Sequence, residues 1–169
     1  VSLAYSVDTI VTWSLPTVPI SLWLNALMGG PLLAAITLYA AQWRALAGRF
    51  GLMLMAASFV ALAANTVVYI VQGMQLGGVA NSVVAAADLV PHYHTMLLAF
   101  ALMCFAGCVL AAFTMHTVSR EAVAHGGGEL VFSKRVLVRL LVSCLLVFAG
   151  VFIMRFAFYM MHLTVGLAV

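Results

Sequence analysis

Four apolar runs, each about 20 residues or longer, constrain the fold of this sequence more than any other feature. A helix of that length crosses a hydrocarbon core roughly 30 Å thick. Only 7% of the 169 residues are charged, whereas a soluble domain needs roughly a quarter to cover its surface. The sequence therefore predicts an all-α fold, an integral membrane bundle of four transmembrane helices that forms a single transmembrane domain over residues 1–169.

The apolar runs also give approximate bounds for the helices. We expect membrane helices over about 19–41, 50–73, 94–117 and 134–162, separated by connections rich in Gly, Pro and polar residues. A short interfacial helix is expected over about 80–89. Pro31 lies inside the first run, where it removes one backbone hydrogen bond and can kink the helix.

The basic residues predict how the helices are oriented. They fall in the connection between the first and second helices and around the connection between the third and fourth: Arg44, Arg49, Arg120, Lys134, Arg135 and Arg139. Cytoplasmic connections of membrane proteins carry an excess of Lys and Arg. We therefore expect the two termini and the second connection to face the side opposite the cytoplasm, which is the periplasm if this is a bacterial inner membrane protein.

Composition argues against several other classes. The net charge of +3 comes from these topogenic residues, so nucleic-acid binding is not expected. Cys104, Cys108 and Cys144 lie in apolar runs without a CxxC pair, so we expect no metal site or iron–sulfur cluster. His94 and His162 could face each other across helices, but both lie at helix ends, and haem is not expected either. A small transporter remains an alternative, although no charged residue lies near the membrane midplane.

Three residues of the last helix are the main candidates for chemistry. Arg155, Tyr159 and His162 follow the spacing i, i+4, i+7 and share one helical stripe. Arg155 lies roughly 28 Å of helix rise beyond Val136, at the outer edge of the hydrocarbon. Together, Arg, Tyr and His supply the charge, hydrogen bond and proton transfer that a quinone headgroup requires. In the alternative interpretation, Arg155 extends to the interface, Tyr159 belongs to an aromatic belt and His162 caps the helix.

Further polar residues collect at the same outer level. Gln72 and His94 are additional candidates for binding a quinol headgroup, and Asp8, Asp88 and His92 for docking a partner. The intramembrane residues Asn25, Asn65, Thr66 and Thr114 are expected to hydrogen-bond between helices. The aromatic residues Trp13, Trp23, Tyr69 and Tyr93 fit a belt at the outer interface, and Trp43 fits the inner one.

Three groups of short segments, in order along the sequence, resemble the membrane anchor subunit of the dimethyl sulfoxide reductase complex. The groups are Val7-Asp8-Thr9 with Thr12-Trp13 and Met28-Gly29-Gly30-Pro31-Leu32-Leu33; Val71-Gln72-Gly73-Met74-Gln75-Leu76 with Ser82 and Ala87-Asp88-Leu89-Val90-Pro91-His92-Tyr93; and Arg155, Phe158-Tyr159, His162 and Thr164-Val165-Gly166. That family's anchor has eight helices, and the present sequence is similar to its back half.

The resemblance implies a non-catalytic subunit of an oxidoreductase complex in anaerobic respiration. Such a subunit oxidises menaquinol without haem and passes the electrons to an iron–sulfur electron-transfer subunit, which feeds a molybdopterin catalytic subunit. Both partners are expected at the periplasmic face. A non-redox membrane scaffold or assembly subunit is the competing interpretation.

Overall fold

Each apolar run forms one helix long enough to cross a membrane, in a computed structural model that describes residues 10, 12–80, 85–124 and 132–161. The helices are α1 (Thr17–Ala40), α2 (Arg49–Leu76), α4 (Tyr93–Ala124) and α5 (Lys134–Met160), with a short 3₁₀ helix η2 (Arg44–Ala47) and a short helix α3 (Ala86–Leu89). The predicted all-α membrane bundle of four transmembrane helices is therefore confirmed.

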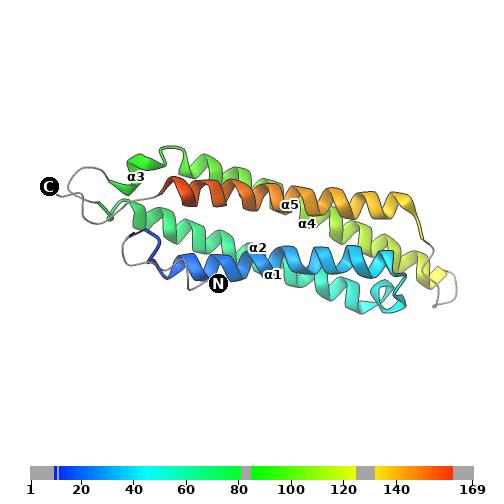
Figure 1. Ribbon diagram of the computed structural model, residues 1–169. Helices are drawn as coiled ribbons and strands as arrows, with labels where there is room; N and C mark the ends of the chain where they lie inside the picture. Colours follow the sequence, from blue (N-terminus) through cyan, green and yellow to red (C-terminus); the bar gives the residue numbers. More distant parts are fainter. Residues whose placement is uncertain (1–9, 11, 81–84, 125–131, 162–169) are drawn as a thin grey trace.

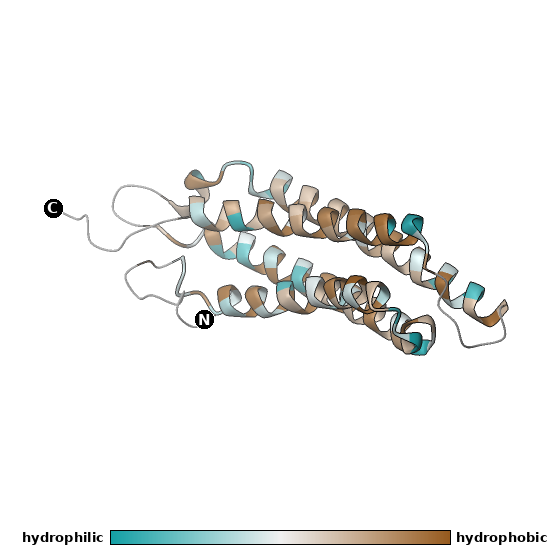
Figure 2. Ribbon diagram, turned by 45° about the vertical axis from the view of Figure 1, so that its right-hand side comes forward, coloured by the Kyte–Doolittle hydropathy of each residue, from teal (hydrophilic) through white to brown (hydrophobic). Residues whose placement is uncertain are grey.

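The long helices run antiparallel to their sequence neighbours and form two hairpins (Figure 1). Within the hairpins, α4 packs extensively on α5, and α1 packs on α2. The two hairpins contact each other where α2 packs on α4 and where α1 packs on α5. Figure 1 places η2, the end of α4 and the start of α5 at one end of the bundle, here called the η2 end. It places α3 at the opposite end, the α3 end. Figure 2 shows mostly hydrophobic helices, with strongly hydrophilic positions at the η2 end and others within the half of the bundle nearer the α3 end.

Three helices extend beyond their predicted bounds. Helix α1 begins at Thr17 and contains Pro19, because the first turn of a helix has no intrahelical partner for its N–H groups. Helix α2 passes through Gly73 to Leu76. Helix α4 continues to Ala124 rather than 117, because the residues that follow Thr117 in the helix include no Gly or Pro to end it. An apolar run thus marks the membrane-spanning part of a helix and not its ends.

The interfacial helix is shorter than predicted. It covers Ala86–Leu89 instead of 80–89, and residues 81–84 lie outside the described part of the molecule. Ala80 and Ala85 pair as an isolated antiparallel bridge, and the Ala86 N–H donates to the Val79 carbonyl at 2.8 Å. Ala80 and Ala85 themselves are therefore paired by backbone and not helical.

Glycines allow α4 and α5 to approach closely. A Cβ at Gly107 would lie 2.7 Å from the Ser143 carbonyl oxygen, and one at Gly150 would lie 2.6 Å from Cys104 Sγ. Helix pairs in membranes associate largely through this kind of small-residue packing, because lipid provides no hydrophobic drive between helices.

Contacts at both ends of the bundle join the N-terminal part of the protein to α5. At the η2 end, the Ser133 N–H donates to the Tyr39 hydroxyl at 2.8 Å. At the α3 end, the Thr12 hydroxyl donates to the Met161 carbonyl, and the Trp13 ring stacks on Phe158 with centroids 4.9 Å apart. The two hairpins are therefore fixed relative to each other at both ends.

Candidate functional site

A series of buried hydrogen bonds links α1 and α2 within the apolar bundle. Asn65 Nδ2 donates to Asn25 Oδ1 at 2.7 Å, and Asn25 Nδ2 donates to the Tyr69 hydroxyl at 3.0 Å. Asn65 is fully buried and Tyr69 is 4% exposed. The prediction that Asn25 and Asn65 hydrogen-bond between helices is confirmed.

The spacing of residues along α2 determines which side chains enter this region. Asn65, Tyr69, Gln72 and Leu76 follow one another at intervals of four, three and four residues, and all are buried. Residues at that spacing share a single helical face. Gln72, only 2% exposed, therefore lies about one turn closer to the α3 end than Tyr69, on the same inward face.

Helix α4 fixes the position of Tyr69 from the other hairpin. The Tyr93 hydroxyl donates to the Tyr69 carbonyl oxygen at 2.7 Å. The Tyr93 ring lies against Gly73, where a Cβ would come within 2.6 Å of Tyr93 Cε1. Gly73 is thus required for close approach and does not terminate the helix. Tyr93 is itself buried, so Tyr69 and Tyr93 are interior groups, and their assignment to an aromatic belt was wrong.

Arg155 approaches the same region from α5. Its guanidinium carbon lies 5.3 Å from the centre of the Phe158 ring, an arrangement that allows a cation–π interaction. The guanidinium also interacts electrostatically with Tyr69. Arg155 Nη2 is buried, and within the described residues it has no hydrogen-bond partner.

Side chains from α1, α2 and α5 interact with Tyr69: Asn25 donates to its hydroxyl, and the Arg155 guanidinium lies within electrostatic range. Ser21 of α1 is also within interaction range of that hydroxyl, and its own hydroxyl donates to the Val18 carbonyl at 2.9 Å. We refer to the group as the Tyr69 cluster, and it comprises Ser21, Asn25, Asn65, Tyr69 and Arg155. Asn65 Oδ1 is a second buried atom of the cluster without a hydrogen-bond partner among the described residues. Among the described residues, the cluster therefore contains one buried donor and one buried acceptor without a hydrogen-bond partner.

The predicted stripe on α5 is only partly represented at this cluster. Tyr159 is 52% exposed and packs edge-on against Trp13, with ring centroids 6.2 Å apart. His162 lies outside the described residues. Of the two candidates among the described residues, the structure brings Arg155 to the buried cluster and leaves Tyr159 exposed.

The remaining candidates differ in whether they are buried or exposed. Gln72 is buried, whereas His94, Asp88 and His92 are exposed at the α3 end. Asp8 lies outside the described part of the molecule. The structure therefore does not place Gln72 and His94 in one environment.

Two threonines expected to bond between helices bond within their own helices instead. The Thr66 hydroxyl donates to the Leu62 carbonyl at 2.8 Å, and the Thr114 hydroxyl donates to the Leu110 carbonyl at 2.7 Å. A threonine hydroxyl in a helix can donate to the carbonyl one turn earlier, as both of these do. This bonding within one helix distinguishes Thr66 and Thr114 from Asn25 and Asn65.

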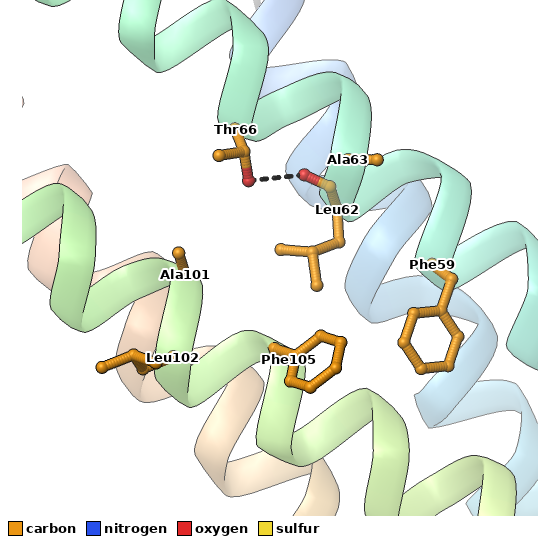
Figure 3. A pocket seen from close by; sticks show the side chains of 7 residues that line it. All are labelled: Phe59, Leu62, Ala63, Thr66, Ala101, Leu102 and Phe105. Atoms are coloured by element: carbon orange, nitrogen blue, oxygen red, sulfur yellow. Dashed lines mark hydrogen bonds between the residues drawn. The ribbon is translucent and has the colours of Figure 1, made fainter.

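A groove of about 510 Å³ separates α2 from α4, as Figure 3 shows. Its lining is apolar apart from the Thr66 hydroxyl, which is already bonded to the Leu62 carbonyl. The rings of Phe59 and Phe105 meet edge-on across it, with centroids 6.2 Å apart. This groove has no free polar group for a headgroup, and the Tyr69 cluster is the better candidate site.

The described residues do not suggest a metal centre. Among them, no three His, Cys, Asp or Glu side chains lie close enough to share an ion. Cys104, Cys108 and Cys144 are buried free thiols.

Comparison with known proteins gives a consistent result over nearly the whole length of the protein. Residues 1–161 match the family described as DMSO reductase anchor subunit (DmsC). The C subunit of anaerobic dimethyl sulfoxide reductase from Escherichia coli K12 is 34% identical over 164 residues, which cover 97% of this protein and 51% of that one. The YnfH subunit of an anaerobic dimethyl sulfoxide reductase from the same organism is 30% identical over 167 residues, which cover 98% of this protein and 52% of that one. The protein thus spans about half the length of these relatives, and no solved structure is significantly similar to it.

Proposed function

Because the protein belongs to the family of dimethyl sulfoxide reductase anchor subunits, we propose that it oxidises menaquinol on behalf of a respiratory reductase complex. In this proposal it holds an iron–sulfur electron-transfer subunit and a molybdopterin catalytic subunit at the bacterial inner membrane. The observation that carries the proposal is the buried guanidinium nitrogen of Arg155, which has no hydrogen-bond partner among the described residues and lies within electrostatic range of Tyr69.

The proposed reaction removes two electrons and two protons from each menaquinol. The electrons pass to the iron–sulfur subunit, and the protons leave to water at the periplasmic side. Arg155 would donate a hydrogen bond to a headgroup oxygen and stabilise the negative charge that grows there as the proton departs. Gln72, on the same inward face of α2 as Tyr69, would hold the headgroup from the α3 end.

Residues nearer water complete the proposed site. His162 would accept the departing proton, because an imidazole changes charge near neutral pH. Tyr159 and His94 are exposed, so their proposed place is at the entrance and not at the headgroup.

The proposed docking face for the iron–sulfur subunit is the α3 end. Asp88 and His92 are exposed there, and Asp8 belongs to the same group in the sequence-based prediction. With both basic connectors at the η2 end, the positive-inside rule favours a periplasmic α3 end. Contact at that face would keep the path from the Tyr69 cluster to the iron–sulfur subunit short.

The test compares quinol oxidation by assembled complexes that carry Arg155→Gln or Tyr69→Phe. Arg155→Gln removes a preorganised charged donor, so it is expected to lower kcat/KM for a short-tailed menaquinol by about 100-fold. Tyr69→Phe removes the hydroxyl that faces Arg155 and should have a smaller effect in the same direction. Arg49→Gln is the matched control, because Arg49 is exposed at the start of α2 at the η2 end.

Two further measurements distinguish the alternatives. If Arg155→Gln leaves quinol oxidation unchanged, Arg155 does not hold the headgroup. If the protein binds no quinol analogue while the catalytic subunit stays membrane-bound, it is a non-redox scaffold. An absorbance band at about 400–430 nm in the purified protein would indicate haem. Flux of a solute across vesicles that lack the partner subunits would indicate a transporter.

A further inference from the structure

A cluster of cations surrounds a surface pocket at the η2 end, where the quinol proposal uses no residue. The pocket has a volume of about 350 Å³ and is lined by Lys134, Arg135, Val138 and Arg139. All four residues are exposed and belong to the first two turns of α5. The sequence from 132 to 161 contains no Asp or Glu, so α5 itself supplies no counter-charge.

The start of α5 adds partial positive charge to the same place. Helix α5 is 27 residues long, and the Ser133 hydroxyl at its N-cap makes no capping hydrogen bond. The first N–H groups of a helix have no partner within it, and their dipoles favour a nearby anion. Three cationic side chains and these amides therefore act together on the pocket.

An exposed apolar row leads from this pocket along α5. Val138, Leu145 and Phe152 are 56%, 69% and 70% exposed, and they recur every seven residues. Residues at that spacing lie nearly above one another on a helix. The same face therefore offers cations at its end and apolar contact along its length.

We propose that this pocket binds the phosphate headgroup of an anionic phospholipid, with an acyl tail lying along Val138, Leu145 and Phe152. Arg side chains suit phosphate because their planar donors can engage two oxygens at once. Basic pockets at the ends of membrane helices bind anionic headgroups by this chemistry. A free phosphate would use the same cations but leave the apolar row without an occupant, and for this reason the lipid is favoured.

Lipid preference of the purified full-length protein provides the test. The protein is placed in nanodiscs that contain equal amounts of phosphatidylglycerol and phosphatidylcholine, and the lipids retained after extraction are identified by native mass spectrometry. The unmodified protein should retain phosphatidylglycerol preferentially. In a variant with Lys134→Gln, Arg135→Gln and Arg139→Gln, the ratio of retained phosphatidylglycerol to phosphatidylcholine should fall about tenfold, since each basic residue near an anionic surface contributes to binding.

Two variants separate a specific pocket from general basicity and from misfolding. Arg44→Gln with Arg49→Gln removes charge from the other connection at the η2 end and should leave the preference unchanged. Arg135→Lys with Arg139→Lys keeps the charge and should keep most of the preference, which guards against a folding defect.

The competition arms identify the source of the bound phosphate. Inorganic phosphate and glycerol phosphate should not displace phosphatidylglycerol at equal concentration, because neither has an acyl tail for the apolar row. Displacement by inorganic phosphate would overturn the lipid assignment. Equal retention of both lipids by the unmodified protein would contradict binding at this pocket. An equal loss of phosphatidylglycerol preference in the α5 Gln variant and in Arg44→Gln with Arg49→Gln would contradict it as well.

Discussion

At the scale of single residues, an apolar environment makes the placement of each polar group decisive. Asn25, Asn65 and Tyr69 hydrogen-bond to one another between α1 and α2, whereas Asn65 Oδ1 and a buried nitrogen of Arg155 have no partner among the described residues. A buried donor without a partner costs free energy, so a group in this state implies a ligand, a water or another protein segment. This cost makes Arg155 more informative than the better-satisfied amides.

The interhelical amide pair should contribute measurably to stability. Asn65→Leu removes the donor to Asn25 Oδ1, and we expect a loss of about 1 kcal/mol in the free energy of unfolding in detergent. Thr66→Val is the neighbouring control, since its hydroxyl bonds only within α2, and its effect should stay near about 0.3 kcal/mol. Equal losses in the two variants would show that the pair has no special role.

The hydroxyl of Tyr93 should also stabilise the site. Tyr93→Phe leaves the ring against Gly73 but removes the hydrogen bond to the Tyr69 carbonyl, at a cost of about 1 kcal/mol. Thermal unfolding measures this loss, and Tyr159→Phe provides a comparison at an exposed tyrosine. If the exposed substitution costs as much as the buried one, the assigned hydrogen bond is not the cause.

How far the sequence predicts the candidate site can be judged from these residues. Asn25 and Asn65 could be recognised as an interhelical pair, because an amide inside an apolar run needs a partner. Tyr69 could not, since a tyrosine near a helix end fits an interfacial belt equally well. The spacing of Asn65, Tyr69 and Gln72 on one face was the signal available, but choosing the inward face of α2 requires the positions of α1 and α5.

At the scale of the helix, small residues and end contacts determine how the two hairpins pack. Apolar runs predicted the number and type of the helices, because lipid demands a length and composition that few other structures meet. The runs could not predict that α4 reaches Ala124, since a helix can continue in water once the apolar part has ended. Crossing contacts such as Gly107 with Ser143 depend on which helices pair, which hydropathy does not encode.

The close contact of α4 with α5 predicts strong sensitivity at Gly150. Gly150→Ala places a Cβ 2.6 Å from Cys104 Sγ and 3.2 Å from the Phe100 carbonyl oxygen, so one helix must move. We expect the free energy of unfolding to fall by about 1–3 kcal/mol. Gly30→Ala is the control, because nothing lies within 4 Å of a Cβ there, and it should be neutral or slightly stabilising. A neutral Gly150→Ala would show that the two helices are farther apart than described.

At the scale of the whole molecule, the basic connectors and the proposed quinol site lie toward opposite ends of the bundle. The cations of both basic connectors lie at the η2 end, whereas the Tyr69 cluster lies toward the α3 end and Asp88 and His92 lie on it. The protein spans about half the length of its relatives, so the proposed quinol site has to work together with whatever packs on the exposed helix faces. Orientation in the membrane then decides on which side a partner can reach the site.

That orientation can be measured with single cysteines at exposed positions near the two ends. If the basic connectors are cytoplasmic, a membrane-impermeant maleimide should label Ala87→Cys in intact spheroplasts. The same reagent should label Ala45→Cys in η2 and Val123→Cys near the end of α4 only after permeabilisation. The three native cysteines are at most 6% exposed, so the unmodified protein serves as the unlabelled control. Labelling of Ala45→Cys and Val123→Cys in intact spheroplasts, with Ala87→Cys protected, would put the α3 end in the cytoplasm and remove the proposed docking face from the periplasm.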